Sequence, residues 1–96
     1  MSDVEVACAE AGDGWACSVR VRDDRGTTEH EVAIRPADAV AHAVHGVDDA
    51  ERLARETFTF LLEREPKESI LRTFDVSVVG RYFPEFEREI RRRLGH

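Results

Sequence analysis

The chain has 96 residues, of which 42% are hydrophobic and 35% are charged. This length suits one domain, residues 1–96, and the composition is typical of a soluble globular protein and excludes a disordered chain. The formal net charge of −6 argues against a protein whose whole surface attracts nucleic acid or anionic lipid.

The sequence carries neither the pattern of a membrane span nor that of an export signal. No apolar run approaches the roughly 20 residues of a spanning helix. The N-terminal segment MSDVEV lacks the basic and then apolar regions of a signal peptide. We therefore expect a cytoplasmic protein without membrane association.

The first two predicted strands span about residues 3–10 and 15–23, because apolar and polar side chains alternate in both. Between them, Gly12-Asp13 favours a two-residue hairpin turn. A slip by one residue would mix the apolar and polar faces, so this turn fixes the register. The expected pairs are Val4 with Val21, Val6 with Val19, and Cys8 with Cys17.

The third predicted strand spans about residues 28–35 and follows a turn centred on Arg25-Gly26. The expected pairs with the second strand are Val21 with His30, Val19 with Val32, and Cys17 with Ile34. Both hairpins then place their apolar side chains on one face. The sequence therefore predicts a three-stranded antiparallel meander with one face covered by helices.

Helical segments follow the strands along the chain. Pro36 begins a predicted helix over about 36–45, and Asp48 with Glu51 forms a capping box for a helix over about 48–65. Beyond Pro66 we predict, in chain order, short turns over about 67–83 and a last helix over about 84–94. The predicted fold class is α+β.

Two cysteines, Cys8 and Cys17, face each other in the predicted register. This placement permits a disulfide or a redox pair. In a cytoplasmic chain we prefer two small core side chains, because free cysteine is among the most buried residue types. The chain has no CxxC motif, so a redox or zinc motif of that type is absent.

A stripe of potential metal ligands lies on the first predicted helix. Asp38, His42 and His45 are spaced by four and three residues, and a carboxylate with imidazoles can hold a divalent ion. His30 and His96 are further potential ligands whose positions the sequence leaves open. Such a stripe is more often a solvated helix face. Metal-dependent activity is therefore the third functional hypothesis, and no cofactor is predicted.

The C-terminal end of the chain carries the basic cluster. Its members are Arg81, Arg88, Arg91, Arg92 and Arg93. Binding of a phosphate ligand or nucleic acid by this cluster is the second hypothesis. Acidic residues precede the arginines, with Glu87–Arg91 and Glu89–Arg93 at i,i+4 spacing, and this order stabilises a helix by itself. We prefer that structural interpretation and do not expect a nucleic-acid partner.

Motifs of catalysis are missing. The sequence lacks a Gly-rich phosphate loop, a GxSxG elbow and an HExxH pair. The mixed charges of residues 63–68 are expected to be solvated rather than catalytic. We predict no catalytic residue.

A partner surface is the favoured functional feature. The first strand is expected at an edge, and its outward residues Glu5, Ala7 and Ala9 leave that edge open to pairing. In the predicted helix over about 48–65, Phe58, Phe60 and Leu62 give more apolar surface than one sheet can cover. Either the short C-terminal helices or a second subunit is expected to cover it. The first hypothesis is therefore a small non-catalytic protein that acts through protein–protein contact, as a homodimer.

Two segments carry a family resemblance. They are EREPKESIL at residues 63–71 and the FD…RYFPEFE pattern at residues 74–87. With them, the chain resembles a family of short uncharacterised prokaryotic proteins over most of its length. The resemblance implies a compact α+β unit and carries over no functional residue.

Overall fold

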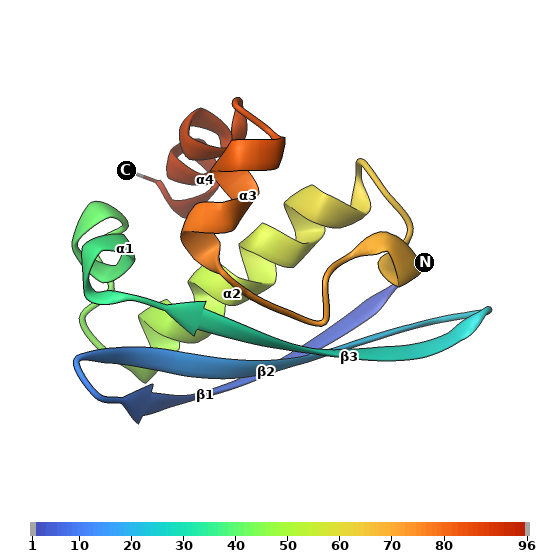
Figure 1. Ribbon diagram of the computed structural model, residues 1–96, viewed down its shortest axis with the longest axis horizontal. Helices are drawn as coiled ribbons and strands as arrows, with labels where there is room; N and C mark the ends of the chain where they lie inside the picture. The colour runs from blue at the N-terminus through green and yellow to red at the C-terminus, as the bar shows by residue number, and fades with distance from the viewer. Residues whose placement is uncertain (1, 96) are drawn as a thin grey trace.

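A twisted sheet with helices on one face forms the protein in the computed structural model, which describes residues 2–95 (Figure 1). The strands, in spatial order, are β1 (Asp3–Ala11), β2 (Gly14–Asp23), β3 (Gly26–Ile34) and β4 (Thr73–Asp75). β1, β2 and β3 pair antiparallel, whereas β4 runs parallel to β3. The predicted α+β class is confirmed, but the sheet is mixed and has one strand more than the predicted meander.

The first hairpin has the predicted register. Its pairs include Val4 with Val21, Val6 with Val19, and Cys8 with Cys17. The two-residue turn needs a left-handed residue, and Gly12 supplies it with φ +59. Turn chemistry and side-chain alternation thus act together to fix this pairing.

The second hairpin differs from its predicted register by two residues. Its pairs are Val19 with His30, Cys17 with Val32, and Trp15 with Ile34. The turn consists of Asp24-Arg25 because the Asp23 carboxylate accepts a 2.8 Å hydrogen bond from the Arg25 amide. A shift of two residues keeps every side chain on its face, so alternation alone cannot detect it.

Two helices follow β3 and both are shorter than predicted. α1 (Pro36–Ala41) ends early because Ala43 is left-handed, with φ +55. α2 (Val47–Leu62) begins after the N-cap Gly46, so the predicted Asp48–Glu51 capping box is wrong. The Glu51 carboxylate instead accepts a 3.1 Å hydrogen bond from the Cys8 amide on β1.

The segment after α2 contains the strand that the sequence pattern did not reveal. It holds a 3₁₀ helix η1 (Lys67–Ser69), then β4, α3 (Val76–Tyr82) and α4 (Phe86–Leu94). Helical turns were expected at β4, but the Glu31 amide donates a 2.7 Å hydrogen bond to the Arg72 carbonyl and draws this segment onto β3. α3 ends at Tyr82 because the residue before a proline, here Phe83, disfavours helical geometry.

One hydrophobic core lies between the sheet and the helices. Val19, Val32 and Ile34 supply the sheet side of it. Leu53 and Phe58 of α2 cover them. α4 packs against α2, whereas α3 contacts β3, β4 and α4. None of the described helices combines the length and the apolar character that crossing a bilayer requires.

Candidate binding pocket

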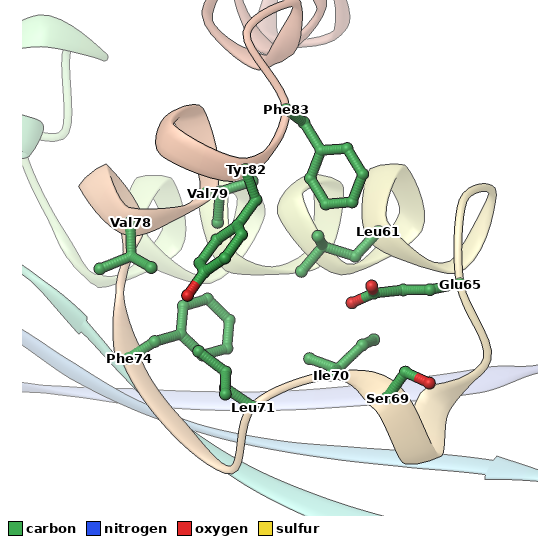
Figure 2. A pocket seen from close by; sticks show the side chains of 10 residues that line it. All are labelled: Leu61, Glu65, Ser69, Ile70, Leu71, Phe74, Val78, Val79, Tyr82 and Phe83. Carbon is green, nitrogen blue, oxygen red and sulfur yellow. The ribbon is translucent and has the colours of Figure 1, made fainter.

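An apolar pocket of about 290 Å³ lies between the end of α2, the η1–β4 segment and α3 (Figure 2). Glu65 and Ser69 are the two lining residues that are neither aliphatic nor aromatic. Leu71 and Tyr82 also line it and are exposed by 50% and 68%. Large exposed hydrophobic side chains beside an apolar hollow are typical of a binding site.

The pocket exists because the chain breaks away from α2 near Pro66 and is anchored again at Lys67. The Lys67 side chain is 1% exposed, and its ammonium donates to Asp23 Oδ1 at 2.6 Å and to the Glu68 carboxylate. These hydrogen bonds raise the pKa of Lys67, and the bond from Lys67 lowers the pKa of Asp23. The prediction that residues 63–68 are all solvated is therefore wrong at Lys67.

His30 holds the pocket wall that contains Leu71. Its ring Nδ1 donates a 2.8 Å hydrogen bond to the Leu71 carbonyl, and Nε2 accepts from the Thr28 hydroxyl at 2.9 Å. This assignment follows because a carbonyl can only accept. The ring is buried against Phe58, with centroids 5.1 Å apart. His30 thus joins β3 to the pocket through two hydrogen bonds.

Glu65 is the charged group that faces the pocket. Figure 2 shows its side chain extending from the turn after α2 toward the centre of the hollow. Partial burial raises the pKa of its carboxyl. Among residues 2–95, no hydrogen bond or ion pair holds this carboxylate. The pocket can therefore take an apolar body together with a group that donates to a carboxylate.

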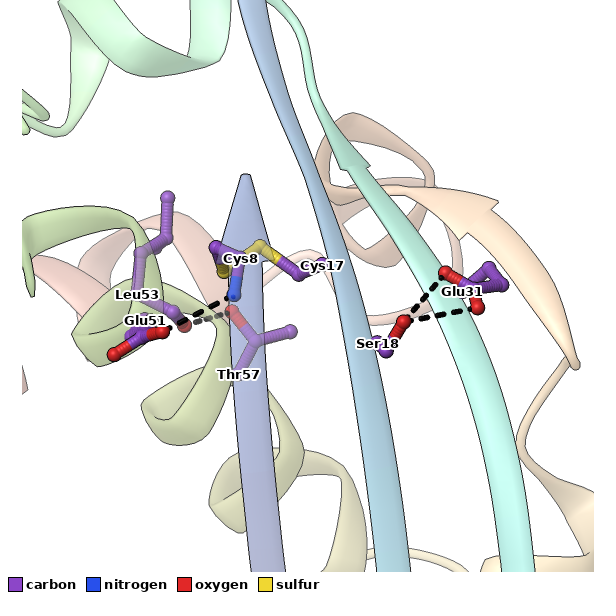
Figure 3. The surroundings of a disulfide bond; sticks show 7 residues. All are labelled: Cys8, Cys17, Ser18, Glu31, Glu51, Leu53 and Thr57. Atoms are coloured by element: carbon purple, nitrogen blue, oxygen red, sulfur yellow. Dashed lines mark hydrogen bonds between the residues drawn. A yellow bond between two sulfur atoms is a disulfide. The ribbon is translucent and has the colours of Figure 1, made fainter. Parts of the chain in front are cut away.

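The two cysteines form a disulfide between β1 and β2 (Figure 3). Cys17 is fully buried and Cys8 is half-buried beside α2. The preferred interpretation of two reduced core side chains is thus wrong. No free cysteine is found in the described chain, so the bond acts here as a cross-link.

The predicted metal stripe does not form one ligand set. Asp38 and His42 are buried, and His42 Nε2 lies 3.4 Å from Glu87 Oε2. Burial raises the pKa of Asp38, whose carboxylate accepts a 3.3 Å hydrogen bond from the Arg35 amide. His45 is exposed, and its amide donates to Asp49. Within residues 2–95 no group of three His, Cys, Asp or Glu is disposed to hold a metal ion; His96 lies outside the described residues.

The basic cluster is divided by ion pairs. Arg92 contacts Glu89 at 2.7 Å, and Arg93 contacts Glu63 at 2.7 Å and Glu89 at 3.7 Å. The predicted Glu89–Arg93 pair is therefore present, whereas Glu87 faces His42. Arg81, Arg88, Arg91 and Arg92 are exposed, and of these four Arg92 is the one that the ion pair with Glu89 occupies. Binding of phosphate or nucleic acid by this cluster stays a prediction with fewer available arginines.

The predicted partner surface is buried in part. Phe58 and Phe60 are 0% exposed, because rings of their own chain surround them. They offer no surface to a partner, and Leu62 is half-buried. Glu5, Ala7 and Ala9 are exposed on β1, at the edge of the sheet. The β1 residues are therefore available for contact, Leu62 is available in part, and Phe58 and Phe60 are not.

Comparisons with protein families, with curated proteins and with solved structures find no match to this chain. The family resemblance of residues 63–71 and 74–87 accordingly stays a prediction. Sequence reasoning placed Glu65 in a solvated run and missed the pocket. Residues 63–65 and 67–69, on the two sides of Pro66, are charged or polar throughout, so no local sequence signal indicates the pocket.

Proposed function

We propose that this protein acts without catalysis, through protein–protein contact, and that it forms a homodimer by pairing its β1 edge with β1 of a second copy. The observation that carries the proposal is the position of β1, a nine-residue strand with β2 on one side only. An edge of this length can template another strand, although the Glu51 carboxylate occupies the Cys8 amide.

The backbone of β1 indicates which groups are available. Cys8 and Cys17 have Cα atoms 4.0 Å apart, as in the narrow, non-hydrogen-bonded pairs of an antiparallel ladder. The Cys8 amide accordingly points outward and reaches Glu51. Because outward amides recur at every second residue, those of Val4, Val6 and Glu10 point the same way.

Side-chain charges favour one register of the dimer. A two-fold axis at Ala7 would set the two copies of Ala7 opposite each other and Glu5 opposite Ala9. An axis at Glu5 would set the two Glu5 carboxylates opposite each other, which is destabilising. The Ala7 register requires the Cys8 amide to exchange Glu51 for the second copy. Solvent can then hydrate the Glu51 carboxylate.

A single proline tests the proposed edge. Val6→Pro removes an outward donor but no hydrogen bond of the β1–β2 ladder, and proline is tolerated at such edge positions. Light scattering should give a dimer for the wild type at tens of micromolar and a monomer for Val6→Pro with unchanged circular dichroism. A monomeric wild type at that concentration would refute the homodimer.

A cross-link tests the register independently. In a Cys8→Ala/Cys17→Ala background, Ala7→Cys should form an intermolecular disulfide, because a narrow antiparallel pair suits disulfide geometry. Ala16→Cys in the same background is the matched control, since Ala16 lies exposed on β2 and away from the edge. Equal cross-linking of both variants would show that the contact does not run along β1.

A further inference from the structure

The carboxylate of Glu65 differs from its neighbours because no cation among residues 2–95 pairs with it. Glu63 pairs with Arg93 at 2.7 Å, and Glu68 pairs with Lys67. The two cations closest in sequence to Glu65 are directed elsewhere. Arg64 Nε donates to Glu85 at 3.1 Å, and Lys67 donates to Asp23. The described chain thus provides cations for the acids around the pocket but none for the acid that faces it.

A carboxylate in apolar surroundings is costly unless a partner compensates its lost hydration. The raised pKa of Glu65, caused by partial burial, reflects this cost. A ligand cation would compensate it and would also be attracted by the aromatic rings of Tyr82 and Phe83 on the pocket wall. A ligand anion would be repelled by Glu65.

The volume of the pocket limits the size of the apolar part of the ligand. This volume of about 290 Å³ lies near the lower end of the range for small-molecule sites. It is roughly twice the cavity that accommodates benzene. The aliphatic stem of a Lys or Arg side chain would leave much of this volume empty. A free molecule with a body of about two rings fits better than a side chain of a partner protein.

We propose that this pocket binds a small organic ammonium ion, with its aromatic or branched apolar body between Phe74, Val79 and Phe83 and its ammonium group on the Glu65 carboxylate. Leu71 and Tyr82, which are exposed at the rim, then cover the apolar body of the ligand. The site is separate from the β1 edge, since no β1 residue lines it.

Three probes of one shape test this proposal by calorimetry on the full chain. They are 1-naphthylmethylamine, the neutral 1-naphthalenemethanol and the anionic 1-naphthoate. We expect the amine to bind at least about tenfold more tightly than the alcohol, because a charge-assisted hydrogen bond to the carboxylate is stronger than a neutral one. The naphthoate should bind most weakly. Equal affinity for all three would overturn the proposal.

Matched variants locate the binding. Glu65→Gln should weaken the amine about tenfold and leave the alcohol unchanged. Glu63→Gln changes the net charge equally, but that carboxylate pairs with Arg93, so it should leave all three affinities unchanged. Ser69→Trp adds bulk at an exposed lining position and should weaken every probe. An unaltered amine affinity in Glu65→Gln would refute the role of Glu65.

A second set of probes separates the free ligand from a partner's side chain. Lysine methyl ester and arginine methyl ester carry cations on thin stems and should bind much more weakly than 1-naphthylmethylamine. If either ester binds as tightly as the naphthyl amine, the pocket recognises a basic side chain of another protein and the small-molecule proposal is wrong.

Discussion

The β1–β3 meander and the segment after Pro66 are stabilised in different ways. In the meander, side-chain contacts between neighbouring strands repeat along the face that the helices do not cover. They are the hydrogen bond of Ser18 with Glu31 and the ion pairs of Arg20 with Glu29 and Arg22 with Glu5. The later segment is held at single points, by Lys67, by His30 and by the Asp75 side chain that caps α3 through the Ser77 amide at 3.0 Å. Repeated contacts hold the meander along its length, whereas single anchors hold the later segment at separate points and leave the apolar pocket between them.

This difference places the two candidate functions in different parts of the molecule. The meander offers backbone groups at a regular edge, which suits strand pairing. The later segment offers an irregular apolar hollow, which suits a small ligand. Variants that act on one region only can therefore test whether the two regions are stabilised independently.

The largest expected effect follows Phe60→Ala. Phe60 is fully buried, with Phe86 and Phe83 ring centroids 5.1 and 5.9 Å away and the Arg64 guanidinium 3.6 Å above its ring. We expect a loss of about 3–5 kcal/mol in the free energy of unfolding, because truncation leaves a cavity. Urea unfolding can be followed by Trp15 fluorescence for the meander and by Tyr82 for the later segment.

In Phe60→Ala the Tyr82 transition should precede that of Trp15, since the cavity lies between α2 and the α3–α4 pair. Leu71→Ala is the control: Leu71 is half-exposed, and its truncation should change the unfolding free energy by less than about 0.5 kcal/mol. Coincident transitions in Phe60→Ala would show that the two regions unfold as one unit.

The next largest effect concerns the meander. Cys8→Ala with Cys17→Ala should lower the free energy of unfolding by about 2 kcal/mol, because the disulfide closes a loop of only nine residues' separation that the hairpin turn already restricts. The loss should appear in the Trp15 transition. Adding reductant to the wild type should reproduce it, and adding reductant to the double variant should change nothing.

A thiol assay on protein from its native host is the decisive companion measurement. Two reactive thiols in the unfolded protein would mean that the cross-link is absent there. Disulfides persist mainly in oxidising compartments. A retained bond would therefore contradict the predicted cytoplasmic location, and reduced thiols would support it.

The sequence predicted the first hairpin fully because its information is local: alternation and Gly12-Asp13 act on the same pairs. In the second hairpin the register depends on the Asp23 side chain. The alternation of apolar and polar residues cannot distinguish two registers that differ by two residues. β4 has three residues, too few for a periodic pattern, and its pairing depends on tertiary contact with β3. Asp75 as a cap of α3 was predictable because capping is local.

The pocket lay beyond sequence reasoning for a related reason. Its walls come from α2, η1, β4 and α3, and no local pattern states the distances between them. A charged run containing Glu65 and Lys67 also gives no sign that one side chain is buried and the other faces a hollow. Burial of Lys67 depends on Asp23, which is 44 positions away in the chain.

The smallest expected effect separates stability from function at Glu65. Its pKa is raised in the folded protein, so the folded state binds a proton more readily than the unfolded chain. The protonated group therefore favours folding below the unfolded pKa, and this contribution is lost as the pH rises through the folded pKa. Glu65→Gln keeps a neutral group at every pH. It should stabilise the protein by about 0.5 kcal/mol at pH 7, after allowance for solvent screening, and by nothing at about pH 3.

Urea unfolding of both proteins at the two pH values measures this difference. Destabilisation at neutral pH would mean that the Glu65 carboxylate has a stabilising partner in the folded chain. With 1-naphthylmethylamine present the order should reverse, because a ligand that binds only the folded state adds RT ln(1 + [L]/Kd) and Glu65→Gln weakens Kd. The Glu65 carboxylate would then lower the free energy of unfolding without ligand and raise it when a ligand cation is bound. A residue with these two effects contributes to binding rather than to folding.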